Sequence, residues 1–253
     1  MRHLDGMQKL TRTAFIATIA LAIITATVWG FRLFAMSRNQ TVTQSTNPAN
    51  YPIGGFPMTG NLAPDFKLTD QFGHSVTLSS LRGHEIVLAF IDSRCKTLCP
   101  LTANIMYDAK VRLGASAASQ VALVAVNANP TATSVVAVQA WSIEHGLLHQ
   151  WLFLTGTAQQ LWSVYHSYHV AVQVNSGGLV AHDPITFLID AQGRERLYFE
   201  TLDSNDKTDL NDQVIGLEAG MRQWLPRTGA GNNACACTST HVQFEGLEHP
   251  TGH

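Results

Sequence analysis

The chain has 253 residues, of which 45% are hydrophobic and only 13% are charged. This apolar, weakly charged composition excludes an intrinsically disordered protein and also a long coiled coil, which needs charged flanking positions. The formal net charge is −2, so no basic surface indicates a nucleic-acid partner. Eleven histidines and two close pairs of cysteines favour metal or redox chemistry over a disulfide scaffold.

Residues 1–12 form a short end that we expect in the cytoplasm, and residues 13–34 are expected to anchor the protein as one transmembrane helix. Between Arg12 and Arg32 the chain carries no charge, and a spanning helix needs about 20 such residues. A cleaved signal peptide is the alternative, but its apolar region is shorter and ends at a small-residue cleavage site. The positive-inside rule weakly favours a cytoplasmic N-terminus, which places the following domain on the non-cytoplasmic side, periplasmic in a bacterium.

Three further regions follow the anchor. Residues 35–59 are polar and turn-rich, which is typical of a tether. Residues 60–226 have the size of one domain. Residues 227–253 are rich in Gly, Asn, Thr and His and show no periodicity, so we expect a flexible tail.

Strand and helix patterns alternate within residues 60–226. Short apolar or alternating runs predict strands at 85–91, 121–127, 151–154, 185–190 and 195–200. Helical spacing predicts helices at 99–113, 134–145, 157–166 and 211–225. Such alternation predicts a three-layer α/β domain, and a turn between the last two strands makes its central sheet mixed.

Cys95 and Cys99 follow the predicted strand at 85–91, in the sequence Cys-Lys-Thr-Leu-Cys-Pro, and open a predicted helix. Residues four apart share a helical face, so both sulfurs can face one point if both lie in the first turn. A helix N-terminus favours thiolates, which are nucleophiles and are ligands for Cu(I) or Zn. The pair is therefore a candidate metal or redox site, and two inert buried cysteines are the alternative.

His182 stands just before the predicted strand at 185–190. Ligands gather at strand ends in α/β sheets. If this strand is the antiparallel neighbour of the strand at 85–91, their adjoining loops face each other. His182 then completes a Cys2His site with Cys95 and Cys99; a solvated loop histidine is the alternative.

The strand, the C-x-x-x-C-P motif and the helix together resemble the Sco/SenC family of membrane-anchored copper proteins. The similarity covers about residues 60–225 and includes Ala63-Pro64-Asp65-Phe66. It implies a thioredoxin-like fold in which Cys95, Cys99 and His182 hold one copper ion, as Cu(I) or Cu(II). It also implies a metallochaperone that assists assembly of the CuA centre of cytochrome c oxidase, by copper delivery or by cysteine reduction. The partner is then the CuA-bearing subunit or another cuproprotein.

This sequence departs from the family pattern near the histidine. Ala181 stands where the family usually has an acidic residue, and Asp183 follows instead, so we expect Asp183 to orient the imidazole. Pro184, before the strand at 185–190, resembles the cis-proline of thioredoxin-like reductases, and an ordinary trans proline opening a strand is an equal alternative.

The cysteine pair is also compatible with other functions. A membrane-anchored thiol–disulfide oxidoreductase, with Cys95 attacking and Cys99 resolving, is the main alternative, although such enzymes usually use C-x-x-C. A CuA domain itself is disfavoured because Ala103 stands where its histidine belongs, and Met106 is better explained as helix core. A structural zinc site needs a fourth ligand. A peroxidase with Arg94 activating Cys95 has little support.

The tail contains a second pair, Cys235 and Cys237. Two thiols separated by one residue can bind one soft ion, so a second copper site is one hypothesis, and an oxidised or inert pair is the other. His145 and His149 have helical spacing, but a helix C-terminus explains them as well as a metal does.

Overall fold

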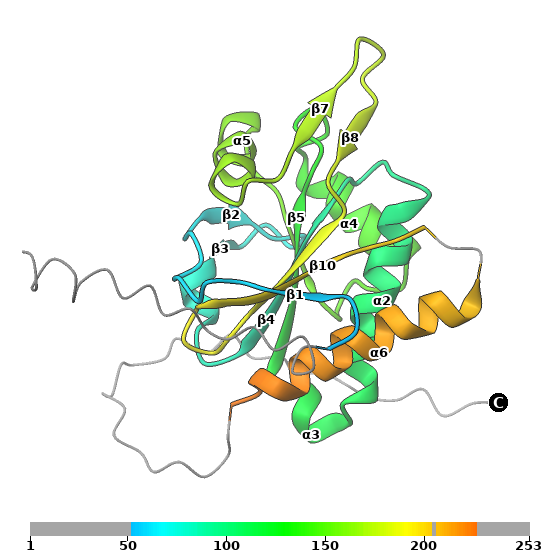
Figure 1. The fold of residues 1–253 in the computed structure, drawn as a ribbon. Coiled ribbons are helices and arrows are strands. Elements are labelled where there is room, and N and C mark those ends of the chain that lie inside the picture. The colour runs from blue at the N-terminus through cyan, green and yellow to red at the C-terminus, as the bar shows by residue number, and fades with distance from the viewer. Residues whose placement is uncertain (1–51, 204–205, 227–253) are drawn as a thin grey trace, which may run out of the picture. The chain divides into compact units, whose positions relative to one another are not determined.

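The computed structural model describes residues 52–203 and 206–226 (Figure 1). The predicted transmembrane segment, most of the tether, and the tail with Cys235 and Cys237 lie outside these residues. Within the part that is described, no helix has the length and apolar character needed to cross a membrane.

A mixed sheet of six strands, in the order β1-β10-β9-β4-β5-β6, forms the centre of the domain. β4, β5 and β6 are parallel, whereas β9 is antiparallel to β4 and is followed by the antiparallel strands β10 and β1. The predicted mixed α/β sheet is therefore confirmed. The strand bounds are β1 Gly55–Pro57, β4 Glu85–Ile91, β5 Val121–Asn127, β6 Leu152–Leu154, β9 Ile185–Ile189 and β10 Glu195–Glu200.

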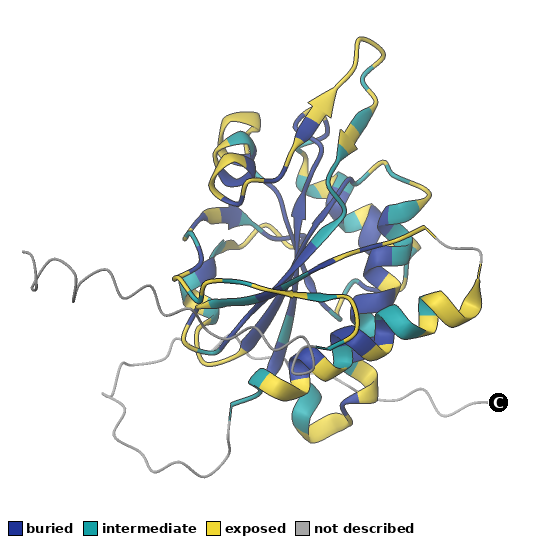
Figure 2. Ribbon diagram, viewed as in Figure 1, coloured by how far each residue is buried: buried dark blue, intermediate teal, exposed yellow. Residues whose placement is uncertain are grey.

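Helices cover both faces of the sheet (Figure 1). One face carries α2, α4 and α6, and the other carries α5. Because neither face of the central strands meets water, their residues are apolar apart from Glu85 at the start of β4 and Asn127 at the end of β5. All of β4 and six of the seven residues of β5 are buried (Figure 2). The helix bounds are α2 Leu98–Arg112, α3 Ala115–Ala118, α4 Val135–Glu144, α5 Ala158–Ser167 and α6 Lys207–Trp224.

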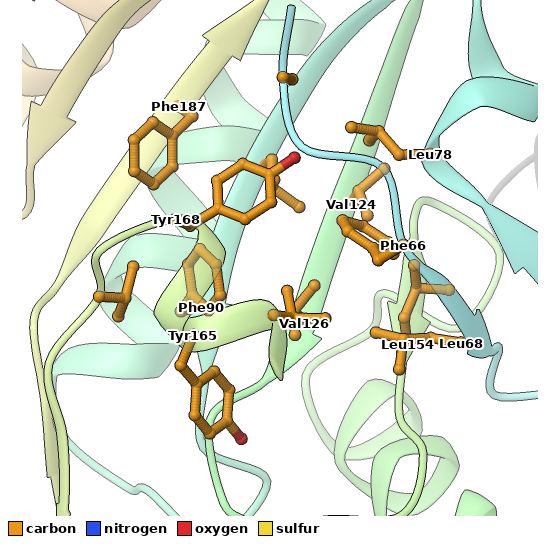
Figure 3. Packing of buried hydrophobic residues seen from close by; sticks show 14 of the residues in the cluster. Phe66, Leu68, Leu78, Phe90, Val124, Val126, Leu154, Tyr165, Tyr168 and Phe187 are labelled. Carbon is orange, nitrogen blue, oxygen red and sulfur yellow. The ribbon is translucent and has the colours of Figure 1, made fainter. Parts of the chain in front are cut away.

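The core under α5 is rich in aromatic side chains (Figure 3). Phe90 of β4 meets Tyr165 edge-on and lies beside Tyr168, while Phe187 of β9 closes the group. The Tyr165 hydroxyl donates a 2.6 Å hydrogen bond to the carbonyl of Asn127, so this buried phenol is satisfied. The core therefore fixes the carboxyl ends of β4 and β5, where the candidate site lies.

Several short elements are not predicted by the sequence. Gly55–Pro57, within the predicted tether, forms the edge strand β1, and Phe56 stacks on Tyr198 of β10. Three-residue strands are too short to show a period of two, so their pairing comes from tertiary contacts. The others are two hairpins, a 3-10 turn and the short helix α3: β2 Lys67–Thr69 with β3 Ser75–Thr77, β7 Val172–Val174 with β8 Val180–His182, Leu78–Leu81, and Ala115–Ala118.

Candidate functional site

The loop between β4 and α2 presents Cys95, and a buried carboxylate holds this loop from inside. The main-chain carbonyl of Asp92 accepts the Cys95 N–H at 3.0 Å, and its Oδ1 accepts the Arg94 N–H at 2.8 Å. Asn129 donates to the same Oδ1 at 2.8 Å, and the Trp141 indole donates to the Cys95 carbonyl at 3.4 Å. The roles of Asp92, Asn129 and Trp141 in this loop were not predicted from the sequence; the available signal was an acidic residue directly after a buried strand.

Cys95 and Cys99 are adjacent, but not as two positions on one helical face. α2 begins at Leu98, so Cys95 lies in the preceding loop and only Cys99 lies in the helix. The N–H of Cys99, one of those left free in the first helical turn, donates to the Cys95 sulfur at 3.4 Å. Cys95 is half-buried and Cys99 is buried.

His182 is the last residue of β8. The hairpin of β7 and β8 projects beyond the sheet (Figure 1), and most of this hairpin is exposed (Figure 2), whereas His182 itself is half-buried. β9, which follows it, is the antiparallel neighbour of β4, as the sequence reasoning required. This pairing brings His182 Nε2 to 3.5 Å from the Cys99 sulfur, although the two residues are 83 positions apart.

A main-chain carbonyl sets the orientation of the His182 ring. Nδ1 lies 3.0 Å from the carbonyl oxygen of Asp183, and because a carbonyl only accepts, we assign the proton to Nδ1. The lone pair of Nε2 is then free to face the sulfur of Cys99. The carboxylate of Asp183 instead accepts the Ala171 N–H at 2.8 Å. Asp183 therefore orients the imidazole through its backbone and not, as expected, through its side chain.

The two thiols have opposite acidity. The hydrogen bond from the Cys99 side chain, with smaller contributions from Thr97 and the backbone, outweighs burial and lowers the pKa of Cys95 to about 5. Donating that bond, together with burial and the negative charge on Cys95, raises the pKa of Cys99 far above that of an ordinary thiol. At neutral pH the pair therefore holds one thiolate and one thiol.

The remaining predicted features can be placed. In the described ranges, no three His, Cys, Asp or Glu side chains converge on one point where a metal could bind. Cys99 instead contacts Cys95 through its N–H and His182 through its sulfur. No described peptide bond is cis, and Pro184 is thus the ordinary trans proline. Met106 is fully buried in α2, which confirms that it belongs to the core.

Histidines at helix ends are explained without a metal. His145 Nδ1 donates to the Trp141 carbonyl at 2.8 Å as α4 ends, and its ring stacks on that of Trp141. His166 Nδ1 donates to the Trp162 carbonyl at 2.7 Å near the end of α5. Each ring therefore donates to a main-chain carbonyl near the C-terminal end of a helix.

The model of the SCO1/SenC family matches residues 57–212, which is more than half of the chain. The chain belongs to the SCO1/SenC family. Among solved structures, apo Sco1 of Thermus thermophilus is similar with a TM-score of 0.59 and 21% identity, covering 70% of this chain and 99% of that chain. ScoI of Arabidopsis thaliana with copper bound has a TM-score of 0.55 and 21% identity, covering 65% of this chain and 100% of that chain.

A third structure is BsSco, described as a member of the Sco family of cytochrome c oxidase assembly proteins with a disulfide switch. Its TM-score is 0.51 at 21% identity, covering 65% of this chain and 96% of that chain. No curated protein sequence matches the chain. These likenesses confirm the thioredoxin-like Sco fold predicted for this SCO1/SenC protein.

Proposed function

We propose that this SCO1/SenC protein binds one copper ion through Cys95, Cys99 and His182 and assists assembly of the CuA centre of cytochrome c oxidase. The observation that carries the proposal is the 3.5 Å approach of His182 Nε2 to the Cys99 sulfur. Two sulfurs and one imidazole are soft and intermediate donors of the kind that copper prefers. The copper-bound ScoI structure and the oxidase assembly role described for BsSco support the same function.

Each residue of the site has its own role in binding copper, which the protein carries as cargo. Cys95 is a ready thiolate, and copper displaces the proton of Cys99, so loading releases about one proton. The Asp183 carbonyl accepts from Nδ1 of His182 and so directs the Nε2 edge of the ring at the site. In the structure the Cys95 sulfur contacts the Cys99 N–H. The half-buried Cys95 side chain therefore has to turn toward His182 for all three ligands to contact one copper ion.

The proposal includes the membrane. Residues 13–34 anchor the protein, and the domain faces the non-cytoplasmic side, where a CuA-bearing subunit or another cuproprotein is its partner. The uncharged stretch between Arg12 and Arg32 supports the anchor. Cysteine-specific labelling of intact cells or spheroplasts with a membrane-impermeant reagent tests this orientation: labelling of Cys95 only after membrane disruption would contradict it.

Thiol–disulfide exchange is the second candidate, and the opposite acidity of the two thiols favours it. The Cys95 thiolate attacks a partner disulfide, forming a mixed disulfide and releasing one partner thiolate. Cys99 then loses its proton and attacks the Cys95 sulfur. The partner leaves with both cysteines reduced, and the protein keeps the two-electron oxidised product, a Cys95–Cys99 disulfide.

Anaerobic titration of the reduced full chain with Cu(I), in competition with a chelator, tests the copper site. We expect one tightly bound ion whose affinity falls by at least tenfold in His182→Ala. His166→Ala is the matched control, because that imidazole also donates Nδ1–H to a carbonyl but has no thiol beside it. Weak binding that is indifferent to His182, combined with rapid reduction of a disulfide peptide, would favour exchange instead.

The tail cysteines call for a separate measurement. If Cys235 and Cys237 bind copper, the full chain takes up a second ion that Cys235→Ser/Cys237→Ser loses. An unchanged stoichiometry in that variant would remove the second site.

A further inference from the structure

The loop that presents Cys95 also presents two cations, Arg94 and Lys96, one on each side of it in the sequence. The main chain here is held from inside by the Asp92 carbonyl and carboxylate and by the Trp141 indole. Because the backbone is anchored from within, both cationic residues are exposed at the surface next to the half-buried thiol.

Neither cation has a partner among the residues that the structure describes. The side chains of Arg94 and Lys96 make no ion pair or hydrogen bond with any residue in the described ranges. Three other surface arginines do bond: Arg112 to Asn211, Arg194 to the Gly60 carbonyl, and Arg222 to Glu218. In a chain with only 16 Lys and Arg, two unpaired cations thus stand beside the exposed end of the site.

The cations are also not what makes Cys95 a thiolate. The main causes of its lowered pKa are the hydrogen bonds from Cys99 and Thr97 and from the backbone, not the charges of Arg94 or Lys96. Both residues are exposed, so their charge can act on an approaching molecule.

We propose that Arg94 and Lys96 bind an acidic surface of the protein that exchanges copper with this site. This inference rests on the proposed function. Opposite charges beside the exchanging ligands align the partner's thiols with Cys95 and raise the rate of encounter, and salt screens the attraction. A partner with a basic rim is repelled at the same place, so the pair also contributes specificity.

The transfer that this contact serves is balanced as follows. Cu(I) keeps its oxidation state and moves from two sulfurs and one imidazole to two thiolates of the acceptor. The acceptor thiols lose two protons; Cys99 regains one and the solvent takes the other. Cys95 remains a thiolate, as in the copper-free protein.

The test uses the full chain in a neutral detergent, loaded with one Cu(I), and two synthetic acceptor peptides with the same Cys-x3-Cys centre. One peptide carries four aspartates as flanks, and the other carries four lysines. Arg94→Gln/Lys96→Gln is compared with Arg194→Gln/Lys207→Gln, which removes the same charge from exposed positions. Arg194 lies far from the copper site. It follows β9, which is antiparallel to β4, so it lies near the start of β4, whereas Cys95 follows the end of β4.

We expect the wild type and the control variant to load the acidic peptide about tenfold faster than the basic peptide at low salt, with the preference vanishing in high salt. Arg94→Gln/Lys96→Gln should lose most of that preference. Because the same two peptides are used throughout, differences in their own copper affinity cancel when the preferences of two protein variants are compared.

Two outcomes would overturn this inference alone. If all proteins bind copper one-to-one but share the same peptide preference, the cations do not recognise an acidic partner, and the copper function stands. If the cations instead bind the full chain to phosphatidylglycerol vesicles without changing peptide preference, they serve a lipid surface. Absence of one-to-one copper binding in the wild type is a different failure, which removes the proposed function and this inference together.

Discussion

Cys99→Ala tests the physical origin of the reactive thiolate. In the structure, the largest cause that lowers the pKa of Cys95 is the hydrogen bond donated by the Cys99 thiol. Alanine removes that donor and leaves the loop otherwise supported by Asp92. Cys99→Ser is the matched control, because its hydroxyl is still able to donate. The pKa of Cys95 should rise in the alanine variant and stay low in the serine variant.

The expected rates follow from two opposing effects. At about pH 6 a thiol with a pKa of about 5 is roughly 90% thiolate, and one at the ordinary value of 9.0 is roughly 0.1% thiolate, a difference of about 900-fold. A less basic thiolate is a weaker nucleophile, by roughly 60-fold for a Brønsted coefficient of about 0.45. If alanine restores the ordinary pKa, the wild type therefore alkylates about 15 times faster at about pH 6. Above about pH 7 the order reverses.

Alkylation with iodoacetamide, followed by mass spectrometry of the Cys95 peptide, measures this without interference from Cys235 and Cys237. The wild type and Cys99→Ser should give rate profiles with a midpoint near the pKa of about 5, and Cys99→Ala should give a higher midpoint and a crossing of the two rate curves. Identical profiles for the wild type and Cys99→Ala would refute the role of the Cys99 hydrogen bond.

Three further predictions concern the rest of the domain. The buried carboxyl of Glu85 has no hydrogen-bond partner among the described residues, and burial raises its pKa from 4.5 to about 9. Native Glu85 thus holds a proton that the unfolded chain has lost between these values, so the unfolding free energy should fall by about 1.4 kcal/mol per pH unit as pH rises through this window. Urea titrations should show that Glu85→Gln removes this part of the slope; an unchanged slope contradicts the assignment. Asp183→Asn should weaken Cu(I) binding by less than tenfold in chelator competition, because the carboxylate bonds to Ala171 and not to the imidazole; a larger loss would show that it acts on the imidazole. Gly216→Ala should lower urea stability by about 1 kcal/mol, since a clash of the new Cβ with the Ile53 carbonyl outweighs the helix propensity gained; a stabilised variant would show that this segment moves aside freely.

Much of the domain was predictable because its signals are local. The strands at 85–91, 121–127 and 195–200 match β4, β5 and β10 residue for residue, since strands buried on both faces are unbroken apolar runs and a hairpin turn marks the last pair. The predicted helices differ from the observed ones mainly at their ends, where caps and not periodicity decide the first residue. The two motif cysteines were also identifiable, because their spacing after a strand is a chemical pattern.

The fold class, the central strands, the cysteine pair and the antiparallel condition on His182 could thus all be inferred from the order of the residues. Whether that condition holds depends on the folded chain, because the pairing of β4 with β9 joins residues far apart in the sequence. The folded chain also determines that Cys95 lies before the helix and receives the Cys99 N–H, and that the Asp183 backbone orients the imidazole. Those contacts depend on where backbone N–H and C=O groups end up in space. Almost every residue carries the same main-chain groups, so the residue type does not indicate which N–H and C=O groups will form hydrogen bonds in the folded chain.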